Sequence, residues 1–251
     1  MISLLNRAKS QAASSGGGAP FAMGNSLYTD GVNDVAVNPS ATTSAFNPFQ
    51  TSAWSASVWV KPTTSATMYP FAIKGGGDTG HRFYFKLNSN RQITIGSHGQ
   101  QAHSGVAFPS SYWTTWNMYS FSINVDSPTQ NTVYMYINGA LFATVVQAKY
   151  SYTFTTTQVS IGALSAGNLG LQGFSTQYVF TENLVPASEW LALYNSGSGA
   201  DPSAVITNPH SIYNITEAVG TTSGDIADAL GEQDLTMSGF VAPFGVNADN
   251  P

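Results

Sequence analysis

The chain has 251 residues, of which 42% are hydrophobic and only 8% are charged, and its formal net charge is −5. This length suits a single all-β domain with a sizeable core, and 12% aromatic residues argue against intrinsic disorder. Its eight Lys and Arg residues form no basic stripe, so we predict no nucleic-acid binding. The absence of cysteine excludes a disulfide scaffold and a thiolate metal site.

Neither a membrane helix nor a signal peptide is predicted. No apolar run approaches the roughly 20 residues that a membrane helix needs. The apolar start precedes Arg7 and Lys9, whereas a signal peptide carries its basic residues first. We therefore expect no membrane insertion and no export by a cleaved signal.

A short arm is predicted before the domain. Residues 1–15 fit a helix that ends in small residues, and a Ser- and Gly-rich linker follows. We predict an arm at 1–20 and one domain at 21–251. A frayed terminus is the commoner interpretation of such a segment, but the linker favours an arm that orders against a partner. The side chains expected to anchor it are Ile2, Leu4 and Leu5.

The first half of the domain has the pattern of short strands separated by turns. Residues 26–37 predict strand, turn and strand, because Asp30-Gly31 and Asn33-Asp34 supply turn chemistry. Residues 52–62 alternate in the way that is typical of a strand with one buried face. Further strands are expected at 68–74, 83–87 and 93–97, with a Gly-rich loop at 75–82 and a polar loop at 98–105.

A three-stranded meander is predicted at 116–146, and the rest of the chain is arranged around it. Turn-forming residues at 127–131 separate its first two strands. Asn138-Gly139 then predicts a two-residue hairpin, because a type I′ turn needs positive φ at both central residues.

The last third is predicted to hold strands and one helix. Strands are expected at 157–164 and 171–184, and a short helix at 186–195 begins with Pro and is followed by Gly197. Residues 210–220 and 232–241 suggest two more strands, and 244–251 suggests an exposed tail.

Taken in order, these segments resemble the laminin-G-like, concanavalin A-like jelly-roll family, which includes pentraxins and many phage and bacterial surface modules. The resemblance covers roughly residues 24–197 and implies an antiparallel β-sandwich. The matching segments are SLYTDGVNDVAV, SASVWVKP, FAIKGGGDTGHRFYFKL, the strand after Trp116, VYMYINGALFATV, VSIGAL and LQGFSTQYVFTENLVPASEWLALYNSG.

Catalysis is not expected. Members of this fold that hydrolyse glucans place carboxylates at alternate positions of one strand, and glycoside hydrolysis normally needs two of them. No glutamate here has an acidic partner two residues away, and the spacing of Asp225 and Asp228 does not fit. We therefore predict no enzyme, no catalytic residue and no cofactor. The glutamates are Glu182, Glu189, Glu217 and Glu232.

A metal site is not expected either. The resemblance implies that the loop at 75–82 is where pentraxins place their first calcium ligands, which makes Asp78 the candidate. Arg82 would compete for this carboxylate, and the loop after the VSIG segment offers no second one. Asp30 and Asp34 could chelate a cation, but turn capping explains them more simply.

A weak glycan site is predicted in the loops. Tyr112 and Trp113 could line a rim with the loop at 98–104, although aromatic residues in a sandwich are more often core. We predict that Trp54, Trp116 and Trp190 are core residues. For Trp59 and Tyr112 the sequence does not decide between a core and an exposed position. The candidate ligand-binding residues are Asp78, His81, Arg82, His98 and Tyr112.

The sequence favours a non-enzymatic structural or adhesive protein of a virion. The arm, the lack of a signal peptide and the nearly uncharged, cysteine-free composition support a capsid decoration or a tail or fibre component. We expect a capsid or tail protein as partner, a homo-oligomer exposed on the particle surface, and weak binding of host surface glycans. The alternative is a soluble carbohydrate-binding lectin.

Overall fold

The computed structural model describes residues 23–37, 53–75, 82–97, 100–149, 157–165, 168–231 and 234–251. The predicted arm at 1–20, with Ile2, Leu4 and Leu5, lies outside the described residues. Asp78, His81 and His98 lie outside them as well. For Arg82, only the backbone is described.

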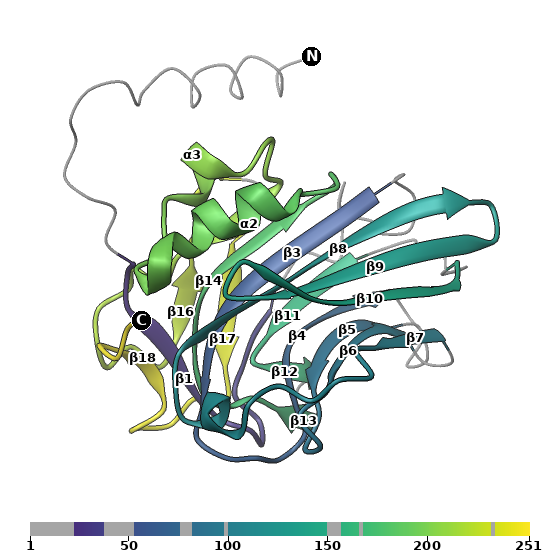
Figure 1. Ribbon diagram of the computed structural model, residues 1–251. Helices are drawn as coiled ribbons and strands as arrows, with labels where there is room; N and C mark the ends of the chain where they lie inside the picture. The colour runs from purple at the N-terminus through teal and green to yellow at the C-terminus, as the bar shows by residue number, and fades with distance from the viewer. Residues whose placement is uncertain are drawn as a thin grey trace.

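Two antiparallel sheets pack face to face, which confirms the predicted all-β sandwich (Figure 1). The first sheet has the order β10-β9-β8-β3-β14-β1-β18, with β15 paired to β14, and the second has the order β16-β17-β2-β11-β4-β5-β6-β7. Strands β12 and β13 form a small hairpin.

In the first sheet the strands are β1 (Ser26–Asp30), β3 (Ala53–Pro62), β8 (Asn117–Ser127), β9 (Gln130–Ile137), β10 (Ala140–Ala148), β14 (Gln172–Thr181), β15 (Ser211–Tyr213) and β18 (Gly245–Asn247). In the second they are β2 (Val35–Val37), β4 (Met68–Gly75), β5 (Arg82–Leu87), β6 (Ile93–Ser97), β7 (Gln100–His103), β11 (Thr157–Ile161), β16 (Gly224–Ile226) and β17 (Leu235–Ser238). The small hairpin consists of β12 (Ala163–Ser165) and β13 (Asn168–Gly170).

The predicted meander is confirmed as β8, β9 and β10. Asn138 and Gly139 have φ of 54° and 76°, as a type I′ turn requires. The Asn138 side chain locks the turn, because its Oδ1 accepts the Met118 N–H at 2.9 Å and its Nδ2 donates to Asn117 Oδ1 at 3.0 Å. The turn therefore sets the pairing register of β9 and β10 through its backbone conformation, and the Asn138 side chain attaches it to β8.

The helix predicted at 186–195 is confirmed as α2 (Ala187–Tyr194). The structure adds a second short helix, α3 (Pro202–Val205), and two 3₁₀ turns, η1 (Ser110–Trp113) and η2 (Asn195–Gly197). Among the described residues, no helix is long and apolar enough to cross a membrane.

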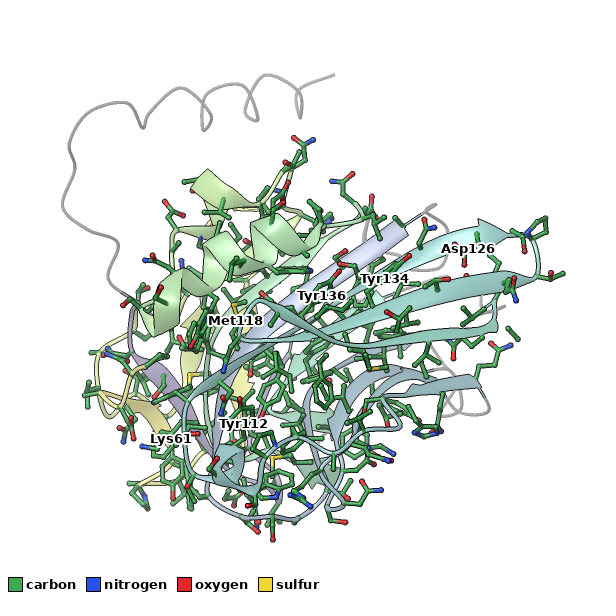
Figure 2. The ribbon with its side chains drawn as sticks, in the orientation of Figure 1. Lys61, Tyr112, Met118, Asp126, Tyr134 and Tyr136 are labelled. Atoms are coloured by element: carbon green, nitrogen blue, oxygen red, sulfur yellow. The ribbon has the colours of Figure 1, made fainter. Side chains whose placement is uncertain are left out.

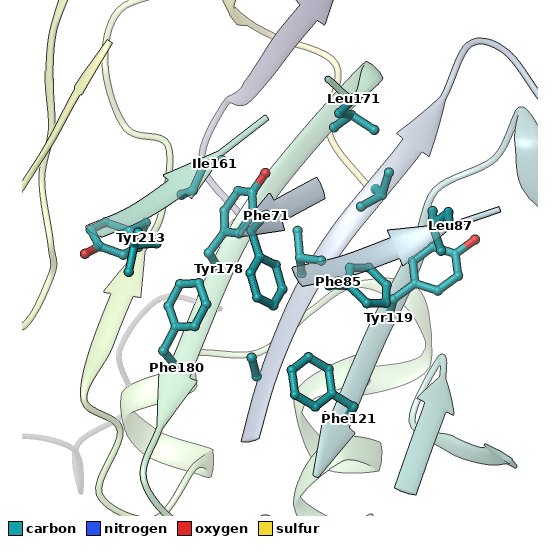
Figure 3. Close-up of a cluster of buried hydrophobic side chains, with 14 of the residues drawn as sticks. Phe71, Phe85, Leu87, Tyr119, Phe121, Ile161, Leu171, Tyr178, Phe180 and Tyr213 are labelled. Atoms are coloured by element: carbon teal, nitrogen blue, oxygen red, sulfur yellow. The ribbon is translucent and has the colours of Figure 1, made fainter. Parts of the chain in front are cut away.

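An aromatic core fills the space between the sheets (Figure 3). Trp54, which is fully buried, meets Phe83 edge to face at a centroid distance of 4.8 Å and Phe121 at 5.0 Å. Phe71 meets Phe180 edge to face at 5.1 Å. Because large rings in such pairs bury much apolar surface, this core supplies most of the driving force for closing the sandwich.

A second apolar cluster lies on the outer face of the first sheet, beneath α2 and α3. Trp190 of α2 is fully buried there, and its Nε1 donates to Ser122 Oγ at 3.0 Å. Trp59 is also buried, and its Nε1 donates to Gln177 Oε1 at 3.0 Å. The prediction that Trp54 and Trp190 are core residues is confirmed. Trp59, which the sequence left open, is a core residue as well.

Two predictions about burial and the tail are wrong. Trp116 is only half-buried, because it precedes β8 at the margin of the cluster and turns its indole N–H toward a carboxylate. The tail at 244–251 is not simply exposed, since β18 pairs with β1 and buries Val246. Pairing with β18 completes the open edge of β1, which explains why a polar tail becomes a strand.

The turn between β1 and β2 contains a buried acid. Asp34 is 1% exposed, and its Oδ2 accepts the Asp30 N–H at 2.8 Å while its Oδ1 is buried without a donor. Burial raises the pKa of Asp34 to about 6, and the neighbouring carboxyl of Asp30 adds to this effect. The folded protein therefore holds a proton here that the unfolded chain releases at lower pH.

This proton makes the stability depend on pH. Since the pKa of Asp34 is raised from 3.8 to about 6, the free energy of unfolding should fall as the pH rises through this interval, by up to about 3 kcal/mol. Asp34→Asn keeps the acceptor for the Asp30 N–H and removes the charge. The free energy of unfolding of this variant should therefore fall less between pH 4 and pH 7 than that of the wild-type protein. Urea unfolding of both proteins across this range measures the effect, and parallel pH profiles would contradict it.

The meander turn also contacts α2. Gly139 has φ of +76°, and a Cβ there would lie 2.6 Å from the Leu191 Cα of the helix. Gly139→Ala should therefore lower the free energy of unfolding by roughly 2–3 kcal/mol through backbone strain and overpacking. Gly220, with φ of +88° and no neighbour within 4 Å, provides the matched control. Gly220→Ala should cost only about 1 kcal/mol, and equal losses for the two variants would show that the contact with α2 contributes nothing.

Candidate functional site

The strand ends that flank the two loops singled out in the sequence lie side by side in the second sheet. The loop at 75–82 joins β4 to β5, and the loop after Ser97 joins β6 to β7. Phe83 at the start of β5 pairs with Ser97 at the end of β6. The candidate residues Asp78, His81 and His98 lie outside the described residues and the side chain of Arg82 is not described, so their predicted role in ligand binding stays a prediction.

Tyr112 lies apart from these strand ends. It lies on η1, after β7 has run back along the sheet, and the nearby Phe108 N–H donates to the carbonyl of Arg91 in the β5–β6 turn at 2.8 Å. Figure 2 shows Tyr112 at the end of the sandwich opposite Asp126. The half-buried ring of Tyr112 stacks on Phe108 at 6.2 Å. The loop predicted at 98–105 is in large part strand β7, and the predicted role of Tyr112 in ligand binding stays a prediction.

The outer face of β5, β6 and β7 carries a polar and aromatic patch that we call the second-sheet patch. Strand alternation points Phe83, Phe85 and Leu87 into the core, so the residues between them face outward. Pairing aligns these outward residues in two rows. One row is Tyr84, Gly96 and Gln101, and the other is Lys86, Thr94 and His103.

The aromatic part of the patch is formed by two tyrosines and a lysine. Tyr69 of β4 meets Tyr84 edge to face at a centroid distance of 5.4 Å, and the Lys86 Nζ lies 5.7 Å from the Tyr84 ring centroid. Burial, with a smaller contribution from Tyr69, raises the pKa of Tyr84 to about 12, so its hydroxyl stays protonated at neutral pH.

Lys86 is the cation of the patch. Partial burial lowers the pKa of its ammonium group from the ordinary value. Within the described residues, the one ion pair joins Lys61 to Asp249, so Lys86 has no carboxylate partner there. A desolvated ammonium beside an aromatic ring favours contact with an acceptor or an anion.

Hydrogen bonds fix the polar part of the patch. Asn88 Nδ2 donates to Thr94 Oγ1 at 2.7 Å, and Thr94 Oγ1 lies 2.9 Å from His103 Nδ1. Because a hydroxyl group can donate and accept, Thr94 links Asn88 to His103, and the tautomer of His103 decides which of Thr94 and His103 donates. The His103 side chain is exposed, so its ring is available to a ligand.

Gly96 lies in the middle of the patch, where the backbone of β7 approaches closely. Its φ is +152°, and a Cβ would lie 2.3 Å from the carbonyl oxygen of Gln100. The close approach of β7 therefore requires glycine, and no side chain fills the position between Tyr84 and Gln101.

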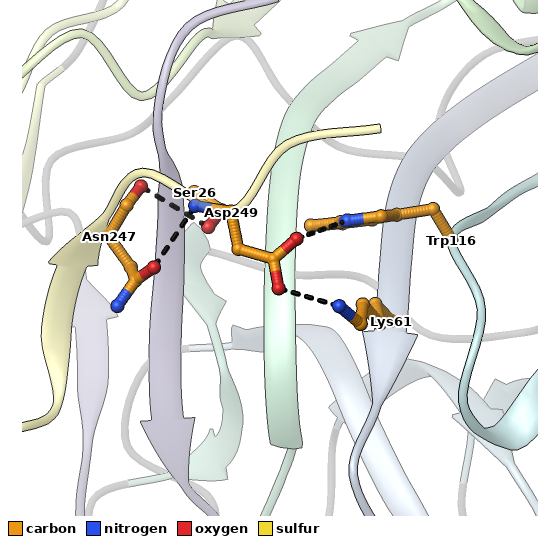
Figure 4. A network of polar contacts seen from close by, with 5 residues as sticks. All are labelled: Ser26, Lys61, Trp116, Asn247 and Asp249. Atoms are coloured by element: carbon orange, nitrogen blue, oxygen red, sulfur yellow. Dashed lines mark hydrogen bonds and ion pairs between the residues drawn. The ribbon is translucent and has the colours of Figure 1, made fainter.

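A second polar group lies on the outer face of the first sheet (Figure 4). Asp249 Oδ2 lies 2.6 Å from Lys61 Nζ, and Trp116 Nε1 donates to Asp249 Oδ1 at 2.9 Å. Partial burial raises the pKa of the Asp249 carboxyl, but the hydrogen bonds from Lys61 and Trp116 and the charge of Lys61 outweigh it, and the pKa lies below its ordinary value. We call Lys61, Trp116 and Phe174, whose ring faces Lys61, the carboxylate pocket.

Metal ligation is not indicated in the described ranges. These residues contain no group of three or more His, Asp or Glu side chains that could hold a metal ion. Asp30 and Asp34, the pair considered from sequence, serve the β1–β2 turn, where Asp30 Oδ1 accepts the Val32 N–H at 2.7 Å.

A family model of the concanavalin A-like lectin/glucanases superfamily matches residues 35–179, which is more than half of the chain. The chain belongs to this superfamily. No curated protein matches the sequence. The superfamily assignment agrees with the sandwich seen here and with the resemblance found in the sequence, and it makes the outer faces and the loops of the sandwich the places to look for ligands.

Solved structures of the superfamily share the fold at low identity. A native heptameric SAP-like pentraxin from Limulus polyphemus is 11% identical with a TM-score of 0.51, and the match covers 70% of this chain and 83% of that chain. The IT-sialidase CBM40 of Ruminococcus gnavus, bound to alpha2,3 sialyllactose, is 13% identical with a TM-score of 0.51, covering 70% of this chain and all of that chain.

The sequence reasoning missed the second-sheet patch and the carboxylate pocket. Alternation in 83–87 and 93–97 already separates Tyr84, Lys86 and Thr94 from the apolar positions, so this signal was present. The alternation does not show the strand pairing that places His103 opposite Thr94. The pocket had no signal in the sequence, because 133 positions separate Trp116 from Asp249.

Proposed function

We propose that the protein is a non-enzymatic, lectin-like module that binds glycans through the second-sheet patch. The observation that carries the proposal is the partly buried Lys86, which has no carboxylate partner among the described residues and lies beside Tyr84, in one row with Thr94 and the exposed His103. Carbohydrate-binding relatives and the superfamily assignment support this interpretation of the patch.

The chemistry of the patch suits a sugar. A sugar ring offers hydroxyl groups that accept and donate hydrogen bonds and C–H faces that pack on aromatic rings. Tyr84 and Tyr69 are 7% and 9% exposed, so they offer protonated hydroxyls more than open ring faces, and His103 and Lys86 provide donors on the neighbouring strands.

The proposal that the module binds without catalysing a reaction rests on where its Asp and Glu residues lie. Strands β4, β5, β6 and β7 carry no Asp or Glu, so the patch has no carboxylate to act as general acid, base or nucleophile. Asp34 is buried in a turn, which keeps it from a substrate.

We propose further that the module is displayed on a virion as a capsid decoration or a tail or fibre component. The arm at 1–20, with Ile2, Leu4 and Leu5, would dock on a capsid or tail protein, and the sandwich would face host glycans. The low charge and the absence of cysteine support this role. We also expect a homo-oligomer, in line with the heptameric pentraxin of similar fold.

Glycan binding is tested on an array followed by calorimetry. Lys86→Met should weaken binding of the best glycan by about tenfold or more, and Tyr84→Phe by about fivefold, because each removes one hydrogen bond to the ligand. Tyr134→Phe is the matched control, since Tyr134 packs with the cluster on the opposite sheet. Unchanged affinity in Lys86→Met and Tyr84→Phe, with binding retained, would place the glycan elsewhere.

The display proposal is tested by deletion of residues 1–20. The shortened protein should keep its melting temperature and its glycan binding but should no longer assemble onto particles. Quantitative mass spectrometry of purified particles measures the incorporation. Normal incorporation of the shortened protein would refute the anchor.

A further inference from the structure

The segment after β18 crosses the first sheet. The strand order β3-β14-β1-β18 places β1 and β14 between β18 and β3, yet Asp249 reaches Lys61 on β3. The Asp249 N–H donates to Asn247 Oδ1 at 3.0 Å, and this short-range bond turns the chain back over the sheet. Figure 4 shows the carboxylate of Asp249 held between Lys61 and Trp116.

The carboxylate pocket is built by the sheet and not by the tail. Lys61 and Phe174 are direct partners in the pairing of β3 with β14, and Tyr28 of β1 stacks on Phe174 at 4.3 Å. Trp116, which precedes β8, approaches Phe174 at 6.3 Å. Lys61 and Phe174 are held by β3 and β14, and Trp116 packs against the second apolar cluster. We therefore expect the pocket to keep its shape when the tail leaves it.

The pocket has the composition of a carboxylate receptor. An ammonium and an indole N–H converge on the two different oxygens of one carboxylate, at 2.6 Å and 2.9 Å. Such charge-assisted, two-point recognition suits an anion with two adjacent oxygens, as in the carboxylate bound here. The rings of Phe174 and Trp116 form an apolar wall beside it, which suits the C–H face of a sugar.

The present occupant can be replaced. The side chains of Lys61 and Asp249 are 29% and 31% exposed, so a competing ligand reaches the pair from solvent. A tethered carboxylate competes with an effective concentration in about the millimolar range, which lowers the apparent affinity for a free acid without abolishing it.

We propose that the carboxylate pocket is a binding site for the carboxylate of an acidic sugar and that Asp249 is an internal stand-in, which such a ligand displaces. The tail is thus an autoinhibitory strap over a site on the sheet opposite to the second-sheet patch. The site is independent of the glycan-binding proposal, because it shares no residue with the second-sheet patch.

The experiment follows the indole N–H resonance of Trp116 during titration with sodium glucuronate, with acetate and glucose in parallel. Asp249→Ala should bind glucuronate at least tenfold more tightly than the wild-type protein, and more tightly than it binds acetate or glucose. The double variant Asp249→Ala/Lys61→Met should lose this gain. Lys86→Met, in the other patch, should leave it unchanged.

Asp249→Asn is the control for a general effect of changing the tail. It keeps an acceptor for Trp116 and lowers the attraction to Lys61, so its affinity for glucuronate should lie between those of the wild-type protein and Asp249→Ala. A Trp116 resonance that does not respond to glucuronate in either variant would overturn the proposal. Equal binding of acetate and glucuronate would also overturn it, since the pocket would then select no sugar.

Discussion

The aromatic core between the two sheets is the constraint on which every outward-facing group depends. Because side chains alternate along a strand, burying Phe83 and Phe85 obliges Tyr84 and Lys86 to face outward. A shift of one residue in the pairing would reverse both sets, and the loss of buried rings forbids it. The register of the second-sheet patch is therefore a consequence of the core and needs no stabilisation of its own.

The first sheet offers less surface to a ligand than the second sheet, because both of its faces are buried over much of their area. Trp54 of β3 faces the core, while Trp59 of the same strand lies under α2 and the segments near it. Only the end of β3 beyond the helix, at Lys61, stays open to solvent and to the tail. The helix thus covers the outer face of β3 around Trp59, and the tail residue Asp249 contacts the open end of the strand at Lys61.

Local signals account for much that was predicted correctly. The strand at 52–62, the Asn138-Gly139 turn and the helix at 186–195 depend on neighbours in sequence, and each was confirmed. The expectation of one buried face for the strand was wrong, because α2 and its neighbours cover the other face as well. The predictions for Trp116 and the tail were wrong, because each depends on which strand ends lie together. The polar loop predicted at 98–105 is in large part strand β7, because its pairing with β6 could not be predicted from its polar residues.

The sequence by itself determined the fold class, the turn chemistry and the face of each strand, because strand period and backbone preference are local properties. Only the tertiary structure decided that Lys86, Thr94 and His103 form one row and that Asp249 meets Lys61 and Trp116. The physical reason is that pairing between distant strands is selected by burial of the whole core, and no short stretch of sequence contains that information.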